Sequence, residues 1–143
     1  MITEDYVSFE VAKLLKEKGF NEHCWKLYEL GDCDIPVLLN GFELSEESSF
    51  WNNKYLELYK KEHSYINDIC SAPTHQMAIS WLREVYGLHI WVEYSRFDFN
   101  KEHPYLWNIV ETKIDGDYWE GTYNKFSKNA VESALNYALE NLI

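Results

Sequence analysis

A chain of 143 residues with 46% hydrophobic side chains fits one domain, residues 1–143, and can bury a sizeable core. Its net charge of −11 argues against nucleic acid as a direct ligand, because phosphate groups are bound through Lys and Arg. Aromatic side chains make up 17% of the residues, so they must either build the core or form a surface that binds other molecules.

The cysteines and the N-terminal sequence indicate the compartment. The chain has an odd number of cysteines, Cys24, Cys33 and Cys70, and its start lacks the basic and apolar regions of a signal peptide. No apolar run approaches the ~20 residues that a membrane helix needs. We therefore expect a cytoplasmic protein with free thiols and no membrane partner.

The first elements have recognisable boundaries. Ser8 is a typical N-cap and Gly19 a typical C-terminal stop, so residues 9–18 are expected to form a helix. Residues 24–30 then alternate loosely between apolar and polar, which predicts a strand.

Residues 35–69 give conflicting signals and form a variable excursion. Residues 36–39 could be a short strand before the Asn-Gly turn, and residues 42–44 could return from that turn as a hairpin. Residues 45–62 contain helix-forming side chains interrupted by Ser and Asn pairs, which predicts one helical piece.

The middle of the chain predicts a helix that follows a cap, either Ser71 or Thr74, and runs to residue 86, then a stop at Gly87 and a strand over residues 88–94. The apolar side chains of residues 77–86 fill an arc of about 200°, which indicates a largely buried helix that crosses the middle of a sheet. In the strand, alternate residues share a face. Leu88, Ile90, Val92 and Tyr94 lie on one face, and His89, Trp91 and Glu93 lie on the other.

Three blocks of sequence carry a resemblance to a known group. They are Tyr6–Leu15, Leu139–Ile143 and Ala72–Glu84, which has the form Ala-Pro-Thr-x-Gln-Met-Ala-x-x-Trp-Leu-Arg-Glu. In these blocks the chain resembles small proteins of gut Bacteroides-type bacteria and their phages. The resemblance implies a bacterial or phage origin, but no activity, cofactor or site residue.

Residues 105–114 and 117–126 are expected to form a hairpin, because Asp115-Gly116 suits a two-residue type I′ turn. That turn would pair Thr112 with Trp119 and Val110 with Gly121. The face that carries Leu106, Asn108 and Val110 would then belong to the core.

The last helix is expected to begin with Ser127 as its cap and to bury an apolar face between residues 130 and 142. The resulting order of elements is α-β-(variable)-α-β-β-β-α. It predicts an α+β fold, with a mainly antiparallel sheet and helices packed on one face.

The side chains that could carry chemistry do not form a recognisable catalytic or metal-binding motif. Cys70 and His75 are the most suggestive thiol–imidazole pair, but Cys70 precedes the helix start that would lower its pKa. Cys24 and Cys33 lack the spacing of a zinc site, and the calcium-like start at residues 32–34 lacks its glycine. We expect no metal and no cofactor.

The second face of the predicted sheet is the candidate interaction surface. It contains Trp91, Tyr105, Trp107, Ile109 and Phe126. Three interpretations are open. Residues 35–66 could cover this face as a second small core, the face could bind a partner or a second copy, or it could stack a carbohydrate or a nucleobase.

Two classes of function follow from these observations. The first hypothesis is a small non-catalytic interaction protein that acts through the aromatic sheet face or its acidic surface, with an unknown protein partner or as a homodimer. The alternative is a small-ligand binder or an enzyme with a site near Cys70, His75 and His89.

Overall fold

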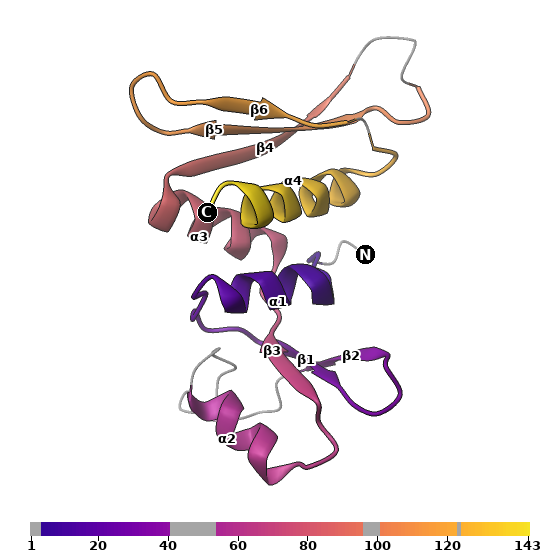
Figure 1. Cartoon of the computed structure of the whole chain (residues 1–143). Coiled ribbons are helices and arrows are strands. Elements are labelled where there is room, and N and C mark those ends of the chain that lie inside the picture. The colour runs from indigo at the N-terminus through magenta and orange to yellow at the C-terminus, as the bar shows by residue number, and fades with distance from the viewer. Residues whose placement is uncertain (1–3, 41–53, 96–100, 123) are drawn as a thin grey trace. The chain divides into compact units, whose positions relative to one another are not determined.

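The computed structural model describes residues 4–40, 54–95, 101–122 and 124–143. The chain divides into two compact units, an N-terminal unit of residues 6–74 and a C-terminal unit of residues 1–5 and 75–143. Helices are interspersed with antiparallel strands along the chain (Figure 1), so the predicted α+β class is confirmed. In the described residues, each unit contains one three-stranded antiparallel sheet.

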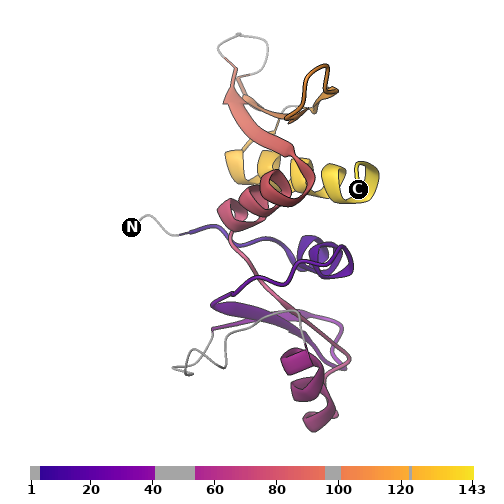
Figure 2. The same ribbon diagram turned by 90° about the vertical axis from the view of Figure 1, so that its left-hand side faces the viewer.

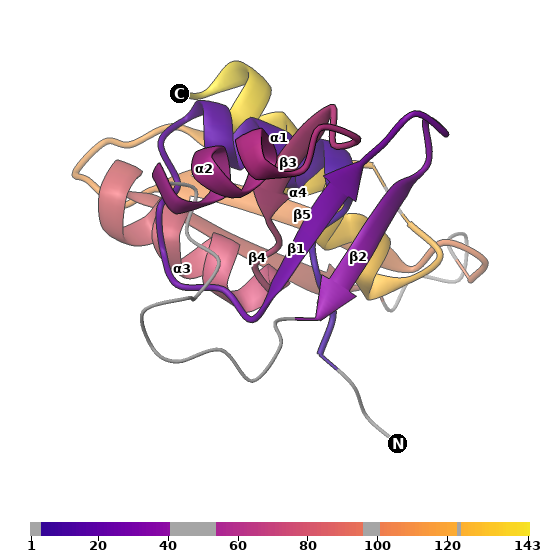
Figure 3. The same ribbon diagram turned by 90° about the horizontal axis from the view of Figure 1, so that it is seen from below.

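The N-terminal unit consists of a sheet and two helices. Its elements in chain order are α1 (Phe9–Glu17), β1 (Lys26–Leu30), β2 (Pro36–Asn40), α2 (Lys54–Glu62) and β3 (Asp68–Ser71). Strand β1 lies between β2 and β3 and is antiparallel to both (Figure 3).

Both predicted ends of α1 are confirmed. The Ser8 hydroxyl accepts a hydrogen bond of 3.2 Å from the backbone N–H of Val11, as an N-cap does. At the other end, Gly19 has a φ of 94°, and the N–H of Phe20 bonds to the carbonyl of Leu15 at 2.9 Å. This is the Schellman arrangement, in which a left-handed glycine ends the helix.

The excursion at residues 35–69 contains β2, α2 and the first residues of β3. The predicted strand at 36–39 and the helical piece are present, whereas the predicted return at residues 42–44 lies outside the described residues. Sequence patterning missed β3, because Ile69, Cys70 and Ser71 are all buried and a short strand without alternation gives no signal.

Lys16 joins three elements of the N-terminal unit. Its ammonium group donates to the carbonyl of Ile69 in β3 at 2.7 Å and lies 3.0 Å from Glu57 Oε1 in α2. Lys16 thus links α1 to a strand and a helix that lie more than 40 residues further along the chain.

The C-terminal unit consists of a sheet with both helices on one side. Its elements are α3 (His75–Tyr86), β4 (Leu88–Tyr94), β5 (Tyr105–Glu111), β6 (Tyr118–Glu120) and α4 (Ser127–Asn141), with the strand order β4-β5-β6. Figures 1 and 2 show α3 and α4 on the same side of this sheet. We call that side the helix-covered face.

Helix α3 ends where expected, but it is less buried than its apolar arc predicted. Gly87 has a φ of 66° and follows the last residue of the helix. Only part of the arc is buried, because α3 packs against β4 and α4 and does not cross the middle of the sheet. The buried residues are Ala78, Trp81 and Leu82, whereas Val85 and Tyr86 are 56% and 40% exposed.

The predicted register of the last hairpin is wrong. The structure pairs Val110 with Tyr118 and Asn108 with Glu120. The Glu111 N–H bonds to the Asp117 carbonyl at 2.9 Å, so residues 112–116 form a longer loop in place of the predicted two-residue turn. The Thr112 N–H bonds to the Gly87 carbonyl at 2.8 Å, beside the start of β4. Within the turn Asp115 has a φ of 58°, whereas a type I′ turn needs positive φ at both central residues.

This shift reverses the expected faces of β5. Ile109 lies opposite Ile90 on the helix-covered face and is fully buried. Trp107 is 6% exposed, and its ring centroid lies 5.2 Å from that of Tyr137 in α4. Side chains that were expected in the core, such as Val110, point to the other face of the sheet.

Gly121 is required by the close approach of Trp107. A Cβ atom at Gly121 would lie 1.7 Å from Cε2 of the Trp107 indole, and the Gly121 N–H bonds to the Trp107 carbonyl at 2.9 Å. The indole therefore occupies the space that a side chain at residue 121 would need.

Helix α4 buries the expected face without the expected cap. Its buried residues are Ala130, Ala134, Leu135, Ala138 and Leu139. The prediction of Ser127 as the N-cap is wrong, since Phe126 holds that position and makes no side-chain capping bond. The helix is positioned by its packing against β4 and β5.

Replacing Gly121 by Ala should destabilise the C-terminal unit by about 1–3 kcal/mol, because the indole of Trp107 must leave its place in the core. Thr122→Ala is the control, since Thr122 is the exposed neighbour of Gly121. Urea unfolding followed by tryptophan fluorescence measures both. Equal midpoints for the two variants would contradict the observed register.

Trp81→Ala should cost about 3–5 kcal/mol, because removal of a buried ring leaves a cavity. Arg83→Ala should cost less than about 1 kcal/mol, because the Arg83–Glu84 ion pair is exposed. Urea unfolding curves of both variants test this difference. A larger loss for the Arg83 variant would mean that the other side of α3 is the buried one.

Candidate binding surface

The face of the β4-β5-β6 sheet that is turned away from the helices carries aromatic rings and carboxylates. Directly opposed residues of antiparallel strands share a face, and Asn108 is opposed by Trp91 on one side and Glu120 on the other. We call this surface the aromatic–acidic face. Its residues are His89, Trp91, Glu93, Leu106, Asn108, Val110, Tyr118 and Glu120.

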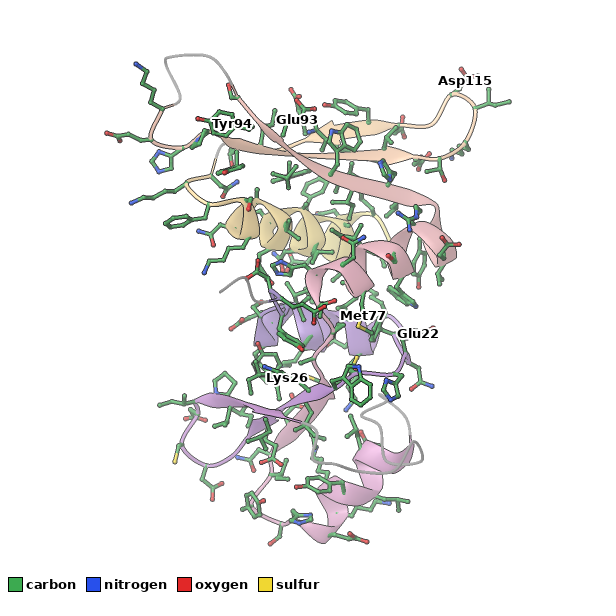
Figure 4. All side chains as sticks on the ribbon, turned by 180° about the vertical axis from the view of Figure 1, so that it is seen from behind. Glu22, Lys26, Met77, Glu93, Tyr94 and Asp115 are labelled. Carbon is green, nitrogen blue, oxygen red and sulfur yellow. The ribbon has the colours of Figure 1, made fainter. Side chains whose placement is uncertain are left out.

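Glu93 accepts two hydrogen bonds within this face. Its Oε1 lies 3.0 Å from Trp91 Nε1 and 3.1 Å from Asn108 Nδ2, and both nitrogens donate. Figure 4 labels Glu93 on the side of the sheet away from α4. The residue is exposed, so these two bonds orient a carboxylate that remains open to solvent.

Asn108 is fully buried although it belongs to the face without helices. The Tyr118 hydroxyl donates to Asn108 Oδ1 and also lies 3.1 Å from Glu120 Oε2. Burial raises the pKa of the Tyr118 hydroxyl, and the neighbouring carboxylates of Glu120 and Glu93 raise it further. Tyr118 therefore keeps its proton at neutral pH.

Three rings lie next to one another on this face, two of them on β4 and one on β6. The His89 and Trp91 rings are stacked, with centroids 5.4 Å apart and an interplanar angle of 27°. The Trp91 and Tyr118 rings are tilted by 43° with centroids 6.3 Å apart. Because Trp91 and Tyr118 come from the two outer strands, their rings meet over Asn108 on the central strand.

The five residues predicted to form one surface do not lie on one face of the sheet. Trp91 lies on the aromatic–acidic face. Tyr105, Trp107 and Ile109 lie on the helix-covered face, where Tyr105 contacts Tyr94 at a centroid distance of 5.5 Å. Phe126 is 51% exposed and precedes α4.

The expected register placed Asn108 in the core, whereas the structure places it on the aromatic–acidic face. It put Tyr118 and Glu120 on the second face, but paired them with Lys113 and Glu111 and not beside Asn108. The signal that could have corrected it is the pairing of a large ring with a glycine, because an indole on the core side can cover a residue without a side chain. Pairing Trp107 with Gly121 gives the observed register.

The two buried thiols, Cys24 and Cys70, do not have the properties of a nucleophile. Burial raises the pKa of Cys70 to about 12, and burial raises the pKa of Cys24 to about 12 as well. At neutral pH both thiols are therefore protonated, whereas thiolate is the reactive form. Cys33 is free and exposed on the turn between β1 and β2.

The two histidines of the alternative site lie in different surroundings. His75 Nε2 donates to Glu132 Oε1 at 2.7 Å and so joins α3 to α4. His89 stacks on Trp91 on the opposite side of the sheet. Cys70 belongs to β3 of the N-terminal unit. In residues 4–40, 54–95, 101–122 and 124–143, no three His, Cys, Asp or Glu side chains form a metal-binding group.

Comparison with known proteins adds no assignment. Family models, curated proteins and solved structures give no significant match. The resemblance to proteins of gut bacteria and phages thus stays a prediction. Within the described part of the chain, no helix has both the length and the apolar character to span a bilayer.

Thiol labelling of the folded protein with iodoacetamide at pH 7.5 should modify Cys33 and spare Cys24 and Cys70. The exposed thiol is accessible, whereas the two buried thiols are protonated and shielded. Peptide mass spectrometry locates the modified residues. Preferential labelling of Cys70 would instead indicate an activated thiol and support a catalytic site.

Proposed function

We propose that this protein is a non-catalytic cytoplasmic interaction protein that binds a basic segment of a partner protein on the aromatic–acidic face. The observation that carries the proposal is the combination of Trp91 and Tyr118 rings with the exposed carboxylates of Glu93 and Glu120 on the sheet face opposite α3 and α4. Aromatic side chains are common anchors of protein interfaces, and carboxylates select basic partners.

Charge favours a basic partner over a second copy of this chain. In a symmetric dimer the same patch meets itself, so Glu93 and Glu120 would face the carboxylates of the other copy. The whole chain carries a net charge of −11, which adds to this repulsion and also attracts basic proteins over longer distances. Nucleic acid is disfavoured for the same reason.

The described polar groups of the face also suit binding better than catalysis. Tyr118 is protonated, and Asn108 and Trp91 are engaged with Glu93, so these groups hold the surface in shape. The buried thiols belong to the other unit and are protonated at neutral pH.

The test uses a 15-residue peptide in which Arg, Ser, Lys and Gly repeat in that order. A matched peptide has Glu in place of every Arg and Lys. Titration followed by ¹H–¹⁵N NMR should shift the Trp91 indole and Asn108 side-chain signals with the basic peptide only. Replacing both Glu93 and Glu120 by Gln should weaken binding by roughly tenfold, because two exposed ion pairs are lost.

Glu84→Gln with Glu140→Gln is the matched control, because it removes the same charge from exposed positions on α3 and α4. Its affinity should stay close to that of the wild type. Light scattering decides between partner binding and self-association. Two results would overturn the proposal. One is a wild-type dimer that dissociates when Glu93 and Glu120 are replaced, and the other is a basic peptide that does not shift the Trp91 and Asn108 signals.

A further inference from the structure

The hydrogens within the aromatic–acidic face can be assigned from its chemistry. A carboxylate only accepts, so the Asn108 atom that faces Glu93 must be the amide nitrogen. The amide oxygen of Asn108 therefore faces Tyr118, and the Tyr118 hydroxyl must donate to it. A hydroxyl has one hydrogen, and this bond uses it.

Tyr118 consequently has no second hydrogen for Glu120. Its oxygen lies 3.1 Å from Glu120 Oε2, and both atoms are acceptors once Tyr118 donates to Asn108. Glu93 Oε1 already takes the hydrogens of Trp91 and Asn108. The face thus presents more acceptor oxygens than hydrogens, and a ligand with several N–H groups would supply what is missing.

The rings beside these oxygens favour a flat cation. Trp91 and Tyr118 lie 6.3 Å apart at their centroids, and Tyr118 is 51% exposed. The faces of such rings attract cations, and a planar guanidinium both stacks on a ring and donates hydrogen bonds in its own plane. An ammonium group is a compact, strongly hydrated charge that cannot stack in this way.

We propose that the Trp91, Tyr118 and Glu120 side chains form a seat for the guanidinium group of an arginine in the partner segment. This inference rests on the proposed function, since it names the side chain by which the basic segment is recognised. The guanidinium stacks on the Trp91 indole and donates in its own plane to Glu120 and the Tyr118 oxygen, and its charge is balanced by Glu120 and Glu93.

Three nine-residue Gly-Ser peptides test the seat, with a central Arg, Lys or citrulline. Citrulline keeps the planar shape of arginine without its charge. NMR titration followed by the Trp91 indole signal should show that the arginine peptide binds about fivefold more tightly than the lysine peptide. The citrulline peptide should cause no shift at the same concentration.

Glu120→Gln provides the decisive variant. Its side-chain amide can donate to the Tyr118 oxygen and so supplies the missing hydrogen within the protein. In this variant the arginine and lysine peptides should bind with about equal affinity. The Glu84→Gln control should keep the preference for the arginine peptide. Glu120 is exposed, and an unchanged amide spectrum elsewhere will show that the variant is folded.

The outcomes separate this inference from the proposed function. Equal binding of the arginine and lysine peptides on the face would overturn the guanidinium seat and leave a general basic-segment surface. An arginine preference that persists in Glu120→Gln would overturn the assigned role of Glu120. Absence of any shift with all three peptides overturns the seat, and the 15-residue basic peptide then decides whether the face binds at all.

Discussion

The contact between the Trp107 indole and the backbone of Gly121 fixes the C-terminal sheet. The indole fills the position of the missing side chain, and the Gly121 N–H bonds to the Trp107 carbonyl at 2.9 Å. Since a shift of one residue would move every side chain of a strand to the other face, this contact decides which side of β5 is buried. Ile109 lies on the same side and completes the core with α4.

The aromatic–acidic face is a consequence of that register. With Trp107 facing the helices, Asn108 must face away from them, and an amide in that place is buried only if other side chains cover it. Trp91 and Tyr118 do so from the two outer strands, and Glu93 and Tyr118 bond to the amide. A polar group beneath two rings holds them in place more specifically than an apolar contact would, because a wrong arrangement leaves it unsatisfied.

The sequence predicted local features well and long-range pairing poorly. The roles of Ser8, Gly19 and Gly87 were correct, because caps and left-handed glycines depend on nearby backbone groups. The faces of β4 were also correct from alternation alone, and with them the position of Trp91. The hairpin register was wrong, because Asp115-Gly116 suits a two-residue turn, whereas the bond from Glu111 to Asp117 closes a longer loop over residues 112–116. The predicted pairing therefore did not bring Tyr118 and Glu120 beside Asn108.

The carboxylates of the face also explain how such a surface can remain uncovered by helices. Aromatic rings exposed on a sheet face promote self-association of a protein through that face. Glu93 and Glu120 would meet their own equivalents in a symmetric contact, and the net charge of −11 opposes approach from any direction. The same two charges lower the energy of a cation placed beside Trp91 and Tyr118. One pair of side chains therefore disfavours self-association and, under the function proposed above, favours a basic partner.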